Sequence, residues 1–121
     1  MNLEEYRFFC LSLPGTEEAL PFDDNVLTFK VGGKIYSLTH IDSFQSINLK
    51  CDPEKATILR EEYPFIIPGN HMNKKHWNTL ENPTTIDSNL LKELTIHSYQ
   101  LIYNKLTKKT KEQIEKDFSQ D

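Results

Sequence analysis

The stretch PGNHMNKKHWNTL, residues 68–80, concentrates side chains that can do chemistry. Two histidines, two lysines and the only tryptophan of the chain fall within it. Lys74 and Lys75 beside Trp77 are the residue types of a phosphate contact next to a stacking platform for a base. This combination predicts a contact with nucleic acid.

A structural role for the same residues is the alternative. Asn73 and Asn78 carry amides that can bind phosphates or base edges, but such amides also satisfy backbone groups in turns. In that interpretation Trp77 is buried against the last helix and the lysines are simply solvated. The sequence leaves both interpretations open.

The spacing of the histidines, cysteines and glycines does not match a known catalytic or metal-binding motif. His71 and His76 are five positions apart, which places them on different faces of either a strand or a helix. Cys10 and Cys51 lie in apolar runs and are expected to be buried thiols. None of the glycines belongs to a phosphate-binding loop. We therefore expect no enzyme, no catalytic residue, no metal site and no cofactor.

Length and charge limit the class of protein. The 121 residues suit one domain, 1–121, whose tail 107–121 is expected to be weakly held. A net charge of -4 argues against non-specific coating of nucleic acid, although it permits a local basic patch. No segment resembles a signal peptide or a membrane span. We expect a cytoplasmic monomer without a membrane partner.

Alternating side chains predict an antiparallel meander. Residues 27–31 and 35–41 flank Gly32–Gly33, and glycine supplies the positive φ of a tight hairpin turn. The run 47–51 continues the pattern, and a short edge strand is expected around residues 18–20. One face of the sheet should be apolar. The expected polar residues of the solvated face are Thr28, Lys30, Asn48 and Lys50.

Helices are predicted before and after these strands. Asn2 can cap a helix that runs to about Leu13. Asp52-Pro53-Glu54 has the cap, the proline and the acid of a helix start, and that helix should end near Tyr63. A long helix is expected from about Asn89 to Leu106. The predicted fold class is α+β, an antiparallel β-meander flanked by N-terminal and C-terminal helices.

Several longer stretches follow one another in a recognisable order. They are CLSLPGTEEALPF (Cys10–Phe22), FKVGGKIYSL (Phe29–Leu38), NLKCDPE (Asn48–Glu54), PGNHMNKKHWNTL (Pro68–Leu80) and LIYNKL (Leu101–Leu106). Through them the sequence resembles the MmcQ/YjbR family of small bacterial proteins, over nearly the whole chain.

The resemblance implies a frataxin/CyaY-like fold and DNA binding by a double wing of β-hairpins. The first wing would be the hairpin at Gly32–Gly33, and the second the segment 74–76. Asn70 departs from the family, where an aromatic residue is common, and this removes one stacking group. The expected nucleic-acid-binding residues are Lys30, Lys34, Lys50, Asn73, Lys74, Lys75, His76 and Trp77.

The alternative function is that of a protein-interaction or chaperone-like adaptor. Such a protein would bind a polypeptide on its sheet, and the acidic stretch 17–24 could meet a basic partner. A positive surface that joins the candidate lysines would favour DNA. A large exposed apolar patch on the sheet would favour a protein partner.

Overall fold

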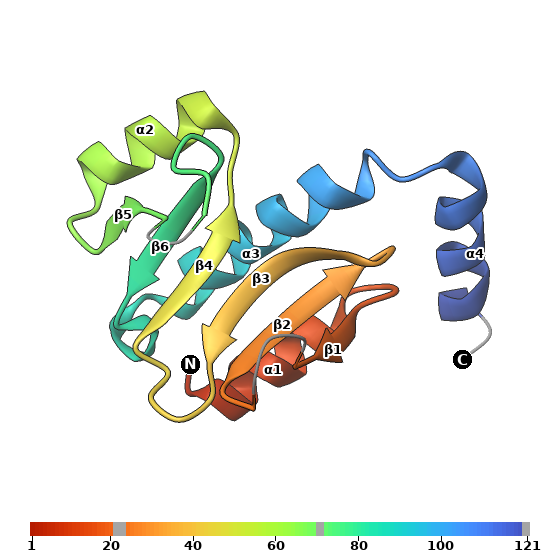
Figure 1. The fold of residues 1–121 in the computed structure, drawn as a ribbon, viewed down its shortest axis with the longest axis horizontal. Helices are drawn as coiled ribbons and strands as arrows, with labels where there is room; N and C mark the ends of the chain where they lie inside the picture. The colour runs from red at the N-terminus through yellow and green to blue at the C-terminus, as the bar shows by residue number, and fades with distance from the viewer. Residues whose placement is uncertain (21–23, 70–71, 120–121) are drawn as a thin grey trace.

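The structure is a computed structural model that describes residues 1–20, 24–69 and 72–119 (Figure 1). It has the predicted α+β class, with an antiparallel sheet and helices at both ends of the chain. Its elements are α1 Leu3–Ser12, β1 Glu17–Ala19, β2 Val26–Val31, β3 Lys34–His40, β4 Ser46–Lys50, α2 Pro53–Glu62, β5 Ile66–Pro68, β6 Trp77–Glu81, the 3-10 helix η1 Pro83–Thr85, α3 Ser88–Tyr103 and α4 Lys108–Ser119.

The six strands lie in the order β1-β2-β3-β4-β6-β5, and every neighbouring pair is antiparallel. The first four strands follow the sequence order, so the predicted meander is confirmed there. Strand β6 was not predicted, and it lies between β4 and β5. Its sequence, WNTLE, carries polar side chains on both faces. The alternation of apolar and polar residues that marks a strand is therefore missing from it.

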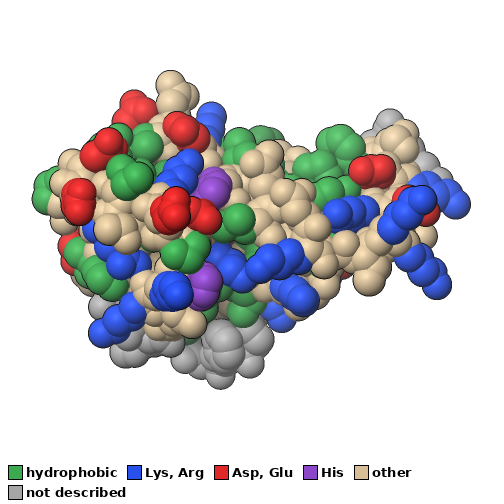
Figure 2. Space-filling model, turned by 90° about the horizontal axis from the view of Figure 1, so that it is seen from above, with side chains coloured by type: hydrophobic (Ala, Val, Ile, Leu, Met, Phe, Trp, Pro, Cys, Tyr) green, Lys and Arg blue, Asp and Glu red, His purple; other side chains and the backbone are tan. Residues whose placement is uncertain are grey.

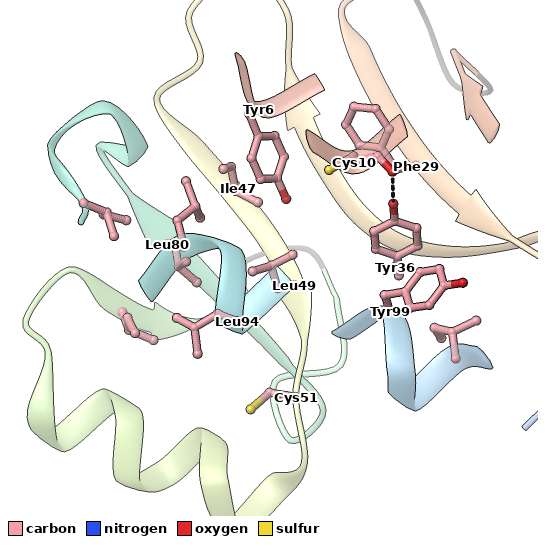
Figure 3. Packing of buried hydrophobic residues seen from close by; sticks show 14 of the residues in the cluster. Tyr6, Cys10, Phe29, Tyr36, Ile47, Leu49, Cys51, Leu80, Leu94 and Tyr99 are labelled. Atoms are coloured by element: carbon pink, nitrogen blue, oxygen red, sulfur yellow. Dashed lines mark hydrogen bonds between the residues drawn. The ribbon is translucent and has the colours of Figure 1, made fainter. Parts of the chain in front are cut away.

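The core lies between one face of the sheet and helices α1, α2 and α3 (Figure 3). Tyr6 of α1 is fully buried, and its hydroxyl lies 2.8 Å from Ser37 Oγ and 3.1 Å from Thr95 Oγ1. The Tyr36 hydroxyl donates to the carbonyl oxygen of Cys10 over 3.3 Å, shown dashed in Figure 3. These bonds satisfy buried hydroxyls and join α1, β3 and α3.

Both cysteines are buried free thiols, as predicted. Cys10 is fully buried in α1, and Cys51 follows β4 with 4% of its surface exposed. Burial raises the pKa of Cys10 to about 12 and also raises the pKa of Cys51. Neither thiol is therefore an activated nucleophile near neutral pH.

The helix starts agree with the predicted caps. The Asn2 side chain accepts from the Glu5 amide, and Asp87 caps α3 in the same way. The predicted end of α3 at Leu106 is wrong, because the helix stops at Tyr103 and the chain turns before α4. Leu106 still packs against the core. It therefore continues the apolar stripe of α3, and the stripe alone gave no sign that the chain turns after Tyr103.

Helix α4 occupies most of the chain after residue 107 and stands beside the rest of the molecule in Figure 1. Across Lys108–Ser119, all of which the structure describes, no residue is fully buried. Ile114 packs against the core and closely approaches Gly15. Within the described ranges, no helix combines the length and the apolar character that a membrane span requires.

The outer face of the sheet is turned toward the viewer in Figure 1, and no helix of the described residues crosses it. Asn48 and Lys50 lie on this face and are partly exposed, as predicted. Thr28 differs from the prediction because it is fully buried. Its hydroxyl donates to the Ala19 carbonyl of the adjoining edge strand over 3.0 Å, which replaces the bond to water.

Candidate nucleic-acid interface

Several strand ends and turns meet at one end of the sheet. Because the strands are antiparallel, β2 ends and β3 begins where β4 ends and β6 begins. The Gly32–Gly33 turn, Lys50 and the turn 73–76 therefore lie along one edge of the molecule. Figure 2 looks down on this end and shows lysine and arginine side chains in a broken band from the α2 side toward α4.

Three lysines from different parts of the chain are close together at this edge. Lys34 begins β3, Lys50 ends β4 and Lys105 follows α3. Partial burial, and then repulsion from Lys105 and Lys34, lower the pKa of the Lys50 ammonium. Every cause of this shift disfavours the positive charge. An anion bound here would therefore relieve repulsion that is present in the free protein.

Leu106 explains how the end of α3 reaches the hairpin. Gly32 has a φ of 59°, and a Cβ added to it would lie 2.5 Å from the Leu106 Cδ2 atom. Glycine thus lets the backbone of the turn lie directly on the leucine, which places Lys105 near the hairpin. Lys105 was not among the predicted site residues, because it follows a helix and no strand or turn pattern places it at this edge. The run of lysines after α3 was the available signal.

Trp77 begins β6 directly opposite Lys50 of β4. The residues that follow them inward, Leu49 and Asn78, are also paired and are almost fully buried on the helix side. Since side chains alternate along a strand, Trp77 and Lys50 must both face outward. Trp77 is partly exposed and lies outside the core cluster. The alternative in which Trp77 is buried against the last helix is therefore wrong.

The turn before β6 is organised by Asn73. Its side-chain oxygen accepts from the Lys75 amide over 2.9 Å, and its carbonyl accepts from the His76 amide over 3.1 Å. The His76 carbonyl in turn accepts from the Cys51 amide at the end of β4, over 2.8 Å. Asn73 therefore has the structural role that the alternative interpretation gave it. Lys74 and Lys75 are left exposed on a turn that is fixed at several points.

Arg60 of α2 supports this turn from behind. Its Nε donates to Asn78 Oδ1 over 2.7 Å, and its Nη2 donates to the carbonyl of Trp77 over 3.3 Å. The same Nη2 also donates to the carbonyl of Lys74. Sequence reasoning missed Arg60, because nothing local in a helix indicates that its guanidinium serves carbonyls some fifteen residues later.

The remaining predicted residues are less closely associated with the cluster. Lys30 lies on β2, and its neighbour across the strands on β1 is the acidic residue Glu17. Asn70 and His71 lie outside the described residues, and their predicted roles rest on the sequence alone. Among the described residues, no three His, Cys, Asp or Glu side chains are grouped so that they could hold a metal ion.

The chain was compared with known families and proteins. The model of the YjbR family matches residues 11–101. The "Uncharacterized protein YbdF" of Escherichia coli O157:H7 is 37% identical over 112 residues, which cover 92% of each chain. The "Uncharacterized protein YjbR" of Escherichia coli strain K12 is 27% identical over 107 residues, covering 88% of this chain and 91% of that protein.

Two solved structures are also similar to this chain in fold and in sequence. The crystal structure of Deinococcus radiodurans protein DR2400, with the family-model domain DUF419, has a TM-score of 0.85 and 39% sequence identity. The similarity covers 93% of this chain and 87% of that chain. A crystal structure of a Pseudomonas syringae protein has a TM-score of 0.70 and 26% identity, over 84% of this chain and 99% of that chain. None of these names states an activity.

Proposed function

The chain belongs to the YjbR family, and we propose that it binds DNA through the end of the sheet described above. The observation that carries this proposal is the convergence of Lys34, Lys50 and Lys105 from three separate elements. Clustered lysines attract phosphates, and their neutralisation releases counterions from the nucleic acid. The β2–β3 turn and the turn 73–76 take the places of the two wings in this proposal.

The charge distribution favours a localised, salt-sensitive contact. The whole chain carries a net charge of -4, so most of its surface repels DNA. Repulsion within the lysine cluster would fall when a phosphate binds, and the pKa of Lys50 would then rise. Added salt should weaken the complex steeply, because it removes the benefit of counterion release.

The turn 73–76 adds a second point of contact. Lys74 and Lys75 are exposed, and the backbone beneath them is held by Arg60 and by the His76–Cys51 bond. A turn that is already ordered loses little conformational entropy when it binds a phosphate. These two lysines therefore extend the contact from the cluster toward α2.

Fluorescence anisotropy with labelled duplex and single-stranded DNA tests the proposal at low and at physiological salt. The triple variant Lys34→Gln, Lys50→Gln, Lys105→Gln should bind more weakly by roughly tenfold per lysine at low salt. The slope of log affinity against log salt should also decrease by about 1 per lysine on duplex DNA.

The matched control is Lys92→Gln, compared with Lys105→Gln alone. Both remove one lysine charge, but Lys92 lies near the start of α3, roughly 16 Å along the helix from its end at Tyr103, which Lys105 follows. Only Lys105→Gln should weaken binding. No binding by the wild type at low salt, or an equal loss in the control, would contradict the proposal.

A polypeptide partner on the open sheet has less support. The large apolar side chains that are exposed among the described residues all lie outside the strands. They are Phe8, Leu11, Leu20, Ile41, Ile58 and Phe118. Apolar side chains on the outer face, such as Leu38 and Ile67, are only partly exposed, which supports this alternative less than a large exposed patch would. The anisotropy experiment also tests this alternative. If the lysine cluster has no role in DNA binding, substitution of its lysines should leave the anisotropy unchanged.

A further inference from the structure

We propose that this end of the sheet takes DNA in its single-stranded form, with one unpaired base stacked on Trp77. The inference rests on the proposed function and assigns the form of DNA that the site binds. Its ground is the juxtaposition of Trp77 and Lys50, which face outward from directly opposed positions on β6 and β4. An aromatic ring beside a lysine is the arrangement that binds single strands without regard to sequence.

The backbone of Trp77 is held on two sides. Its carbonyl accepts from the Gly69 amide over 2.9 Å and from Arg60 Nη2 over 3.3 Å. A Cβ added to Gly69 would lie 2.9 Å from the Trp77 Cβ, so the glycine gives the tryptophan side chain the room it needs. The other edge of β6 is paired with β4. The ring is therefore presented from a fixed position, which reduces the entropy lost on stacking.

The phosphate contacts continue from Trp77 across the sheet. Lys50 is on the neighbouring strand, and Lys34 begins the strand after that. Ser37 of β3 is level with Leu49 of β4, so Lys34 lies about two residues beyond Lys50 along the strand direction. With strands about 4.8 Å apart and a rise of about 3.3 Å per residue, the backbones of Trp77 and Lys34 are roughly 12 Å apart. Lys34 is opposite the core residue Val31, so its side chain leaves the end of the sheet on the helix side. Lys105 adds a further charge beside Lys50. A short run of nucleotides can thus lie across the strand ends, with a base on the ring and its neighbouring phosphates on the lysines.

The position of the ring favours an unpaired base over a duplex. In a duplex the faces of the bases are stacked on one another, and proteins reach only their edges in the grooves. A side chain that enters a duplex as a wedge must project between base steps. Trp77 is instead partly buried within the surface of a sheet. A base that is free to leave the stack can reach such a ring, whereas a paired base cannot.

The single tryptophan of the chain makes the test direct. Oligo(dT) and a duplex of equal length are titrated at low salt, with tryptophan fluorescence and the anisotropy of labelled DNA as readouts. Oligo(dT) should quench Trp77 and bind more tightly than the duplex. Trp77→Leu should weaken oligo(dT) binding about 5- to 150-fold, the equivalent of ~1–3 kcal/mol for one stacked base.

Trp77→Phe is the second variant, because it keeps an aromatic face with less area. It should retain most of the affinity for oligo(dT), and circular dichroism establishes that both variants are folded. If the duplex binds at least as tightly as oligo(dT) and Trp77→Leu leaves the affinities unchanged, this inference fails while the proposed function stands. If neither form of DNA binds to the wild type at low salt, both fail.

Discussion

The guanidinium of Arg60 on α2 donates from Nε to the side-chain oxygen of Asn78 on β6 over 2.7 Å. Asn78 is 1% exposed and faces the helix side of the sheet, where a buried amide needs a partner. Its Nδ2 finds no acceptor among the described residues, so the bond from Arg60 to Oδ1 compensates the burial of the oxygen alone. The same guanidinium binds the carbonyls of Lys74 and Trp77. One side chain therefore couples α2, the buried side of β6 and the exposed basic turn.

Replacement of Arg60 should show whether DNA binding depends on the conformation of the turn 73–76 as well as on its lysine charges. Arg60→Met keeps most of the aliphatic stem but removes the donor to the Asn78 oxygen and to the Lys74 carbonyl, and it leaves the Trp77 carbonyl with the Gly69 amide. The free energy of unfolding should fall by about 1–3 kcal/mol, measured by urea denaturation. DNA binding should weaken although Lys74 and Lys75 are still present, because the turn that carries them is no longer fixed.

Arg60→Lys is the control for this prediction. It keeps the positive charge but has no planar fork to serve three oxygens at once. It should therefore resemble Arg60→Met in both measurements. An Arg60→Lys variant with wild-type DNA affinity would mean that Arg60 acts through its charge and does not position the turn.

Lys50 should show opposite effects on binding and on stability. Its pKa is lowered in the folded protein by burial and by two lysines, so the charged form costs free energy in the fold. Lys50→Gln should leave stability at pH 7 unchanged or raise it, within about 0.5 kcal/mol, while it weakens DNA binding. The difference in stability should shrink as the pH rises from below the lowered pKa toward the unfolded value near 10.4, since wild-type Lys50 then loses its charge.

Thermal unfolding of both proteins between neutral and alkaline pH measures this difference. Lys109→Gln serves as the control for stability, since Lys109 is exposed on α4, whereas the Lys92 ammonium lies 5.6 Å from the centre of the Phe9 ring. A clear loss of stability in Lys50→Gln at pH 7 would show that Lys50 has a structural partner and would weaken the case for a binding role.

The two glycines of the β2–β3 turn form a matched pair. Both have positive φ, 59° at Gly32 and 82° at Gly33, so alanine at either position costs on the order of 1 kcal/mol in backbone strain. A Cβ at Gly32 would also meet Leu106 at 2.5 Å, whereas a Cβ at Gly33 would meet open space. Gly32→Ala should therefore be the more destabilising substitution in denaturant unfolding.

A double substitution tests the cause of that difference. In a Leu106→Ala background, Gly32→Ala and Gly33→Ala should cost nearly the same, because the leucine is no longer in the way. Gly32→Ala should also weaken DNA binding more than Gly33→Ala, since it pushes the hairpin away from Lys105. Equal effects of the two glycine variants in the wild-type background would contradict the close contact between the turn and Leu106.

Local patterns predicted most of the fold. The β2–β3 hairpin follows from alternation around two glycines, and α2 follows from the Asp52-Pro53 start. Strand β6 escaped prediction because its buried residues include the polar Asn78 and Thr79, and the partner of Asn78 comes from another element. Without its register, the face occupied by Trp77 was undetermined, since a shift of one residue would exchange Trp77 and Asn78.

The sequence predicted only part of the candidate site, because some of its residues are brought together by tertiary contacts. Lys34 and Lys50 stand at strand ends, which a meander brings to one edge, so their proximity follows from topology. Trp77 joins them through the pairing of β6 with β4, which was not predicted. Lys105 joins them only because Leu106 packs under a glycine turn, and this is a tertiary contact without a sequence signature. Arg60 belongs to the site for the same kind of reason.

The ion pair between α1 and β1 gives a prediction for acid stability. Arg7 meets Glu18 with both groups of its fork, Nη2 to Oε1 at 2.5 Å and Nε to Oε2 at 2.6 Å. The hydrogen bond to Arg7 lowers the pKa of Glu18. The pair is largely exposed, so Glu18→Gln should cost no more than about 1 kcal/mol at pH 7.

The sign of the pH dependence follows from the lowered pKa. The stabilisation by Glu18 is complete above its unfolded pKa of about 4.3 and is lost as the pH falls through the lower folded value. Wild type and Glu18→Gln should therefore differ in melting temperature at pH 7 and converge in strong acid. Glu17→Gln removes a carboxylate from the same strand without breaking the Arg7–Glu18 pair, so it is the control for the loss of charge at pH 7. A Glu18→Gln melting curve equal to the wild type at pH 7 would mean that solvent screening cancels the pair altogether.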